Sequence, residues 1–109
     1  AFTAAVMGKT TGGAQEIGKQ TKKEKIIGKA QKIVGKRGNS YGTPYQNFSR
    51  IAKLWSCHLE KDISVYDVGV LFMLAKIARS KEDMNHEDTW IDIAGYAGAT
   101  AEAIDDSTT

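Results

Sequence analysis

The stretch that decides the fold is residues 64–80, SVYDVGVLFMLAKIARS. Ser64 and Asp67 have the spacing of a capping box, in which each side chain accepts a hydrogen bond from the other residue's backbone N–H, so a helix is predicted from here to about Ser80. Residues 68–75 are apolar on every side of that helix. Such a helix belongs at the centre of a bundle or in a subunit interface, because a monomer surface rarely tolerates so wide an apolar patch.

Two helices are predicted before this stretch. Thr21 and Glu24 have capping-box spacing at the start of a first helix over about residues 21–36. Residues 38–44 are dense in turn formers and predict a loop. Apolar residues then recur at helical spacing over residues 48–59, which predicts a second helix that ends near residue 60.

A fourth helix is predicted after the polar loop at residues 81–86, and it ends near residue 105. Small residues in its apolar row permit close packing; the row consists of Trp90, Ile93, Ala94, Ala97 and Ala101. The short loop makes the third and fourth helices antiparallel neighbours. The predicted fold class is therefore all-α, with about four helices in a compact bundle.

The composition is that of a globular protein. The chain has 109 residues, 41% of them hydrophobic and 26% charged, which predicts one domain. The longest apolar run is too short to cross a bilayer, so no membrane partner is expected. The lone cysteine, Cys57, leaves no partner for an intramolecular disulfide; it is expected to pack as a small hydrophobic residue in a reducing, cytoplasmic compartment.

Charge is distributed unevenly along the chain. Residues 1–53 hold eleven lysines and arginines against two acids, whereas residues 54–109 hold four against eleven. Residues 1–20 show no helical or strand periodicity and are rich in glycine. The sequence therefore predicts a flexible basic arm at residues 1–20, a helical domain at residues 21–105 and a frayed tail at residues 106–109. The positive charge of the arm predicts an acidic partner, either a protein or a nucleic acid.

A row of lysines follows helical spacing along one side of the first predicted helix; it consists of Lys22, Lys25, Lys29, Lys32 and Lys36. These side chains could contact the phosphates of a nucleic acid or another acidic partner. The alternative is a helix face that only contacts solvent. Arginine and interleaved aromatic residues are nearly absent here, so specific base readout is not expected.

A second charged cluster combines Lys76 and Arg79 of the third helix with Asp88 and Asp92 of the fourth. The two aspartates are four residues apart, so they project together, on the side opposite the Trp90 row. The cluster could form a structural ion-pair network or bind a ligand or a metal ion, whose identity the sequence leaves open.

The chain resembles a widespread phage-encoded protein family of unknown function over about residues 26–102. The combined pattern that carries the resemblance is YGTP at residues 41–44, NF at 47–48, IA at 51–52, LWS at 54–56, KIAR at 76–79 and, after Asp88, DIAGYA at 92–97. The resemblance implies a bacteriophage or prophage accessory protein in the cytoplasm of the host bacterium, with a virion location as the alternative.

The last helices are also similar, more distantly, to MazG-like all-α nucleotide pyrophosphatases. Those enzymes hold Mg²⁺ with four acidic side chains. This chain departs from that pattern, since it has Asn47, Arg50 and Lys53 where carboxylates would be needed. Magnesium is therefore expected only under this enzymatic alternative, and otherwise no cofactor is expected.

The sequence favours a homo-oligomeric accessory protein that binds a phosphate-bearing, nucleotide-like ligand, and no catalytic residue is assigned. Three roles are expected in the ligand site. Phosphate contacts are assigned to Lys76, Arg79 and Arg37, hydrogen bonds to Asn47 and Tyr41, and orientation of the cations to Asp88 and Asp92. One alternative is a protein- or DNA-interaction module that uses the arm and the third helix, in the virion, in host takeover or in anti-defence. The other alternative is a MazG-like pyrophosphatase.

Deletion of residues 1–18 tests the proposed boundary of the helical domain. Because these residues contain no recognisable core positions, the shortened chain should keep the melting temperature of the full chain, as measured by circular dichroism. A large drop would place the arm in the core or in a subunit interface.

Overall fold

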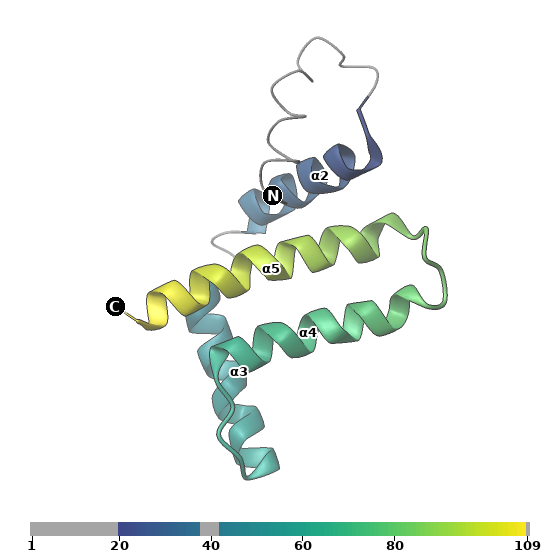
Figure 1. The fold of residues 1–109 in the computed structure, drawn as a ribbon. Coiled ribbons are helices and arrows are strands. Elements are labelled where there is room, and N and C mark those ends of the chain that lie inside the picture. Colours follow the sequence, from purple (N-terminus) through teal and green to yellow (C-terminus); the bar gives the residue numbers. More distant parts are fainter. Residues whose placement is uncertain (1–19, 38–41, 109) are drawn as a thin grey trace.

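The computed structural model describes residues 20–37 and 42–108, apart from the side chains of residues 36 and 37. Within these ranges the chain forms four α-helices and no strand (Figure 1). The helices are α2 (Lys22–Arg37), α3 (Pro44–Leu59), α4 (Val65–Ser80) and α5 (Glu87–Ser107). The predicted all-α class with four helices is confirmed. Most of the predicted arm lies outside the described residues, so that assignment stays a prediction.

Both predicted capping boxes are present. The backbone N–H of Thr21 donates to Glu24 Oε1 at 3.0 Å, and that of Glu24 donates to Thr21 Oγ1 at 3.2 Å. The backbone N–H of Ser64 donates to Asp67 Oδ2 at 2.9 Å, and that of Asp67 donates to Ser64 Oγ at 3.1 Å. These bonds satisfy backbone donors that would otherwise have no partner in the first turn, which is why α2 and α4 begin where they do.

Helix α3 begins with a third capping box that the sequence analysis did not identify. The backbone N–H of Gln46 donates to Thr43 Oγ1 at 3.1 Å, and that of Thr43 donates to Gln46 Oε1 at 3.0 Å. Pro44 follows at the first helical position, where its missing N–H is no loss. The helix ends at Glu60, whose φ of 55° and ψ of 43° are left-handed and stop the helical repeat.

Helices α4 and α5 run antiparallel and side by side, as predicted (Figure 1). They approach each other closely at Gly69, where an added Cβ would lie 2.0 Å from Oγ1 of Thr100. The Thr100 hydroxyl donates to the carbonyl oxygen of Tyr96 at 2.5 Å, so this polar group is satisfied inside the contact. Where the chain turns into α5, Trp90 Nε1 donates to the carbonyl oxygen of Met84 at 2.9 Å.

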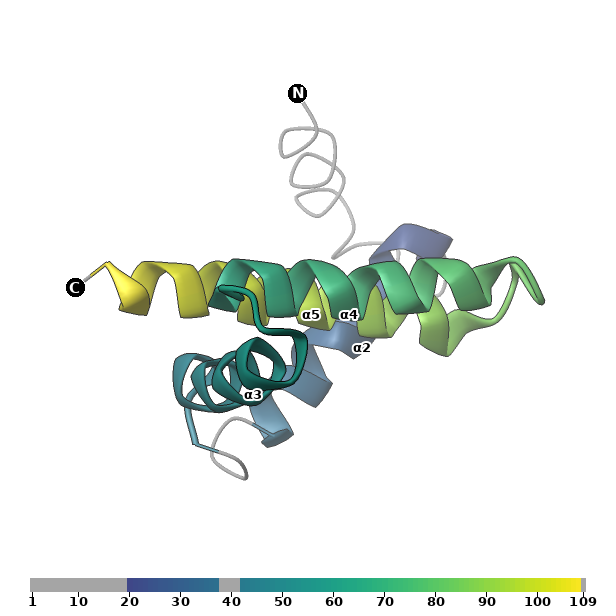
Figure 2. The same cartoon turned by 90° about the horizontal axis from the view of Figure 1, so that it is seen from below.

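Helix α3 lies across one side of the α4–α5 pair (Figure 2). The buried core at this crossing consists of Phe48, Ala52, Val68 and Ala103. The ring of Phe72 packs against this core. The distance between ring centroids is 6.1 Å from Phe72 to Phe48, 5.6 Å to Trp55 and 5.0 Å to Tyr96. This aromatic cluster joins α3, α4 and α5.

Most of the apolar row predicted for the last helix is not on the side that packs, although Ile93 and Ala94 are half-buried. Trp90 is 39% exposed, and Ala97 and Ala101 are exposed. The buried residues of α5 are Thr89, Ile91, Thr100 and Ala103. A threonine can be buried in a helix when its hydroxyl donates a hydrogen bond to a carbonyl oxygen one turn earlier. A prediction based on apolar residues alone therefore does not count these threonines as part of the buried side.

Cys57 is exposed on α3, so the expectation that it packs as a small hydrophobic residue is wrong. No helix in the described part of the chain has the length and apolarity needed to cross a membrane.

Replacement of Gly69 tests the close crossing of α4 and α5. Gly69→Ala should lower the free energy of unfolding by about 1–3 kcal/mol, because the new Cβ must push Thr100 out of contact. The matched control is Gly28→Ala on α2, where nothing lies within 4 Å; it should raise stability by up to about 1 kcal/mol through helix propensity. Denaturant melts measure both changes, and a stabilising Gly69→Ala would refute the close crossing.

Candidate functional site

A cavity of about 580 Å³ lies where α2, the start of α3, Lys76 of α4 and the middle of α5 meet. Its wall has an apolar part and a polar part. The apolar part includes Ala30, Ile33, Val34, Phe48 and Ile91, and the polar part consists of Thr43, Asn47, Lys76, Asp92, Tyr96 and Glu102. Four helices thus bring together residues that are distant in sequence.

Lys76 and Asp92 form an ion pair across α4 and α5, with 2.9 Å between Lys76 Nζ and Asp92 Oδ2. Their side chains are 26% and 35% exposed, respectively, so both can still be reached by solvent. Half of the charged cluster expected from the sequence is therefore assembled at the wall of the cavity. The pair is open to a ligand and is not part of the buried core.

Arg79 and Asp88 make no ion pair with each other and do not line the cavity. Arg79 follows Lys76 by three residues and Asp88 precedes Asp92 by four, so both lie about one turn nearer the loop between α4 and α5 than the ion pair at the cavity. Both side chains are exposed. The expected cluster of four charges is therefore divided, and two of its members lie in the site.

Asn47, expected as a hydrogen-bonding ligand, lines the cavity from the first turns of α3. Tyr41 and the side chain of Arg37 lie outside the described residues. The site also contains Tyr96 and Glu102, which the sequence analysis did not assign. Tyr96 follows Asp92 by four residues, so helical spacing could have identified it, whereas only the position of α2 and α3 brings Glu102 to the same wall.

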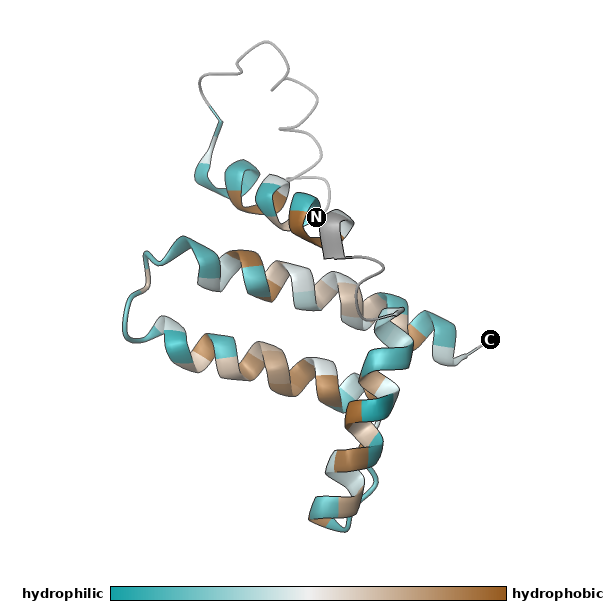
Figure 3. Ribbon diagram, turned by 180° about the vertical axis from the view of Figure 1, so that it is seen from behind, coloured by the Kyte–Doolittle hydropathy of each residue, from teal (hydrophilic) through white to brown (hydrophobic). Residues whose placement is uncertain are grey.

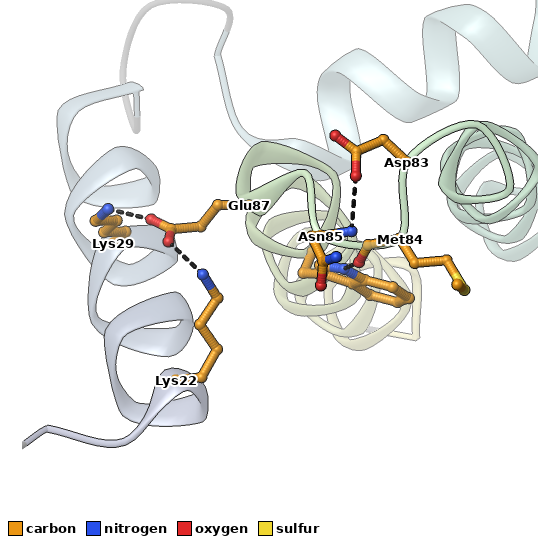
Figure 4. A network of polar contacts seen from close by, with 7 residues as sticks. Lys22, Lys29, Asp83, Met84, Asn85 and Glu87 are labelled. Carbon is orange, nitrogen blue, oxygen red and sulfur yellow. Dashed lines mark hydrogen bonds and ion pairs between the residues drawn. The ribbon is translucent and has the colours of Figure 1, made fainter.

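Two lysines of the predicted row hold α2 against α5 (Figure 4). Lys22 Nζ lies 2.8 Å from Glu87 Oε2, and Lys29 Nζ pairs with the other oxygen of the same carboxylate. Hydrogen bonds from Lys22 and Lys29 lower the pKa of Glu87 from 4.5 to about 2. Lys25 and Lys32 are exposed, and the side chain of Lys36 lies outside the described residues.

The residues present do not fit the magnesium site of a MazG-like pyrophosphatase. Among residues 20–37 and 42–108, no group of three histidine, cysteine, aspartate or glutamate side chains could hold a metal ion. The cavity contains the carboxylates of Asp92 and Glu102, and Asp92 is already paired with Lys76. A hard cation such as Mg²⁺ takes oxygen ligands in near-octahedral geometry, which these side chains do not assemble.

Over the described residues, the fold and the cavity define an all-α domain with a mixed polar and apolar site at the junction of four helices. By sequence the chain belongs to the family of the domain of unknown function DUF6378, whose profile matches residues 25–104. No solved structure matches the chain.

Two curated relatives are proteins of mycobacteriophages. The chain is 49% identical over 76 residues to the Gene 55 protein of Mycobacterium phage D29, an alignment that covers 69% of this chain and 50% of that protein. It is 43% identical over 75 residues to the Gene 55 protein of Mycobacterium phage L5, with 67% and 48% covered. The chain therefore spans about half the length of the curated relatives it matches. These matches support the expected resemblance to phage proteins of unknown function.

The ion pairs of Glu87 predict a pH-dependent attachment of α2. Because the folded-state pKa is lowered, the carboxylate stabilises the fold fully above its ordinary pKa of 4.5, and this stabilisation is lost as the pH falls towards 2. Hydrogen exchange of the α2 amides should be slower in the wild type than in Glu87→Gln at pH 6, and the difference should shrink towards pH 2. Exchange that is equal at pH 6 would show that Glu87 does not hold α2.

Proposed function

We propose that the cavity binds a small phosphate-bearing ligand of the nucleotide class. The observation that carries the proposal is that Asn47, Lys76 and Asp92, from three helices, line one cavity of about 580 Å³. Pockets for small ligands have volumes of about 300–1,000 Å³ and combine an apolar wall with a few polar groups. The likeness to mycobacteriophage proteins supports a further part of the proposal, that the chain is a phage or prophage accessory protein in the host bacterial cytoplasm.

Two positive features of the cavity wall favour a phosphate. Lys76 supplies the ammonium group, and Thr43 and Pro44 bring the N-terminus of α3 to the wall. The positive end of a helix dipole favours an anion, and no acidic residue in the first turn of α3 neutralises it. Arg79 lies outside the cavity, so the phosphate role expected for it passes to Lys76 and this helix end.

The cavity also offers a surface that suits a planar, partly apolar group. Phe48, Ile91 and Tyr96 line it, and the amide of Asn47 offers both donors and an acceptor. The ring of Tyr96 stacks on Phe72 with an interplanar angle of 7°, which holds the ring in place. A nucleobase could lie against this wall while its phosphate reaches Lys76.

The ion pair between Lys76 and Asp92 gives the proposal a sharp test, because the carboxylate already binds the ammonium group. A phosphate must share or displace this carboxylate to bind the ammonium group. Asp92 therefore orients Lys76 but also opposes the anion. Removal of the two charges should have opposite effects on affinity.

Calorimetry with nucleoside mono-, di- and triphosphates tests the site. Lys76→Met should weaken binding roughly 10–100-fold, because a charge-assisted hydrogen bond contributes about 1.5–3 kcal/mol. Asp92→Asn should strengthen binding, since the competing negative charge is removed. The matched control is Arg79→Gln, which removes one positive charge from the same helix outside the cavity and should leave the affinity unchanged.

Three results would contradict the proposal. One is a wild-type protein that binds no nucleotide, and another is equal weakening by Lys76→Met and Arg79→Gln. The third is Mg²⁺-dependent hydrolysis of a triphosphate that requires Asp88 and Asp92, which would favour the MazG-like alternative. Denaturant melts of Lys76→Met separate an effect on binding from an effect on folding, because loss of an ion pair that solvent still reaches lowers stability by only about 0–1 kcal/mol.

A further inference from the structure

Helix α4 is apolar on two opposite sides, and only one of them is buried. Val68 and Gly69 are buried in the fold. On the other side Tyr66 is 57% exposed, Leu74 52% and Ile77 48%. Figure 1 shows α5 between α2 and α4, so α4 lies at the edge of this row of helices. Figure 3 shows that the middle of α4 is an almost unbroken apolar stretch. Monomeric proteins rarely expose a continuous apolar strip of this kind, so a partner is expected to cover it.

The strip has the pattern of a helix that packs against another helix. Leu74 lies at its centre, and the four positions that surround a helical residue on the same face are those three and four residues before and after it. Around Leu74 these positions are Val70, Leu71, Ile77 and Ala78, and all four are apolar. They form the kind of hole that receives an apolar side chain from a facing helix.

Charges at the two ends of the strip complement each other when the strip faces a second copy of itself. Asp67 lies seven residues before Leu74, and Lys81 lies seven residues after it. Seven residues are almost two full turns, so the three residues share one line along the helix. Neither Asp67 nor Lys81 forms an ion pair with any described residue.

We infer that a second copy of this chain docks on the exposed side of α4, with the two α4 helices antiparallel and Leu74 at the two-fold axis. Each Leu74 enters the hole around its counterpart, and Asp67 of each copy faces Lys81 of the other. A two-fold interface must be self-complementary in this way, and opposite charges fix its orientation and register. A parallel pair would place like charges together.

Residues 1–19 are a poorer occupant of the same surface. Their large apolar residues are Phe2, Val6, Met7 and Ile17, and their charges are Lys9, Glu16 and Lys19. To match the line through Leu74, the segment would need an apolar residue with an acidic residue seven positions to one side and a basic residue seven positions to the other. It contains no such arrangement. A second α4 has that match by symmetry.

Sedimentation of the full chain and two point variants tests the surface. The wild type should be a dimer at tens of micromolar, and Leu74→Glu should raise the dissociation constant roughly 100-fold or more, because it places two like charges in an apolar contact. The control is Leu54→Glu on α3, a leucine that is 68% exposed and lies outside the strip; it should remain dimeric. Circular dichroism checks that both variants are folded.

Cysteine cross-linking tests the antiparallel register, in a Cys57→Ser background because Cys57 is exposed. Leu74→Cys should form a disulfide-linked dimer with itself. Val70→Cys and Ala78→Cys should each fail to link alone, since equivalent positions lie about 12 Å apart along the axis, but should link when the two variants are mixed. Efficient self-linking of Val70→Cys and Ala78→Cys would show a parallel pair and overturn the proposal.

Other outcomes also overturn the proposal. One such outcome is a wild type that stays monomeric at 100 μM. Another is a monomer that dimerises only after residues 1–19 are deleted, since this result would show that those residues cover the strip of α4. A dimer that survives Leu74→Glu would show that the copies meet elsewhere. The nucleotide-binding test is independent, because the cavity and the strip share no residue.

Discussion

The structure depends most on the close crossing of α4 and α5 at Gly69 and Thr100. Only the absence of a side chain at Gly69 lets Thr100 lie against the backbone of α4. This approach brings Lys76 within ion-pair distance of Asp92. The core beside α3 and the polar wall of the cavity both follow from the same pair of helices.

The four helices are held by different interactions. Helix α3 is fastened by buried and aromatic groups, from Phe48 to Trp55, which contact α4 and α5. Helix α2 contacts α5 through the buried Ala30 and through Glu87, which binds two lysines. Apolar contact persists at all pH values, whereas the carboxylate must stay ionised. The contribution of Glu87 to the attachment of α2 therefore depends on pH.

The cavity and the exposed strip of α4 suit different partners. The cavity has a limited volume, an ammonium group and an amide, which match a small anionic ligand with a planar part. The strip is long, apolar and flanked by opposite charges, which match another helix. Lys76 and Leu74 are two residues apart on α4 and turn to different sides, so one helix can serve both surfaces without conflict.

The sequence by itself determined the all-α class, the four helices and, to within a few residues, their ends. Capping boxes such as Ser64 with Asp67 are local, so hydrogen bonds between near neighbours suffice to place a helix start. The sequence also predicted that Lys76 would meet Asp92, because a short loop makes the two helices antiparallel neighbours.

Tertiary structure alone decided which side of each helix is buried. The side of α5 that packs contains Thr89 and Thr100, while the apolar row with Trp90 and Ala97 is exposed. Periodicity shows that a helix has an apolar side, but the buried side depends on where the neighbouring helices approach. The same holds for the site: the packing of α2 and α3 against α4 and α5 decides which side chains line the cavity, so Lys76, Asp92 and Glu102 do and Arg79 and Asp88 do not.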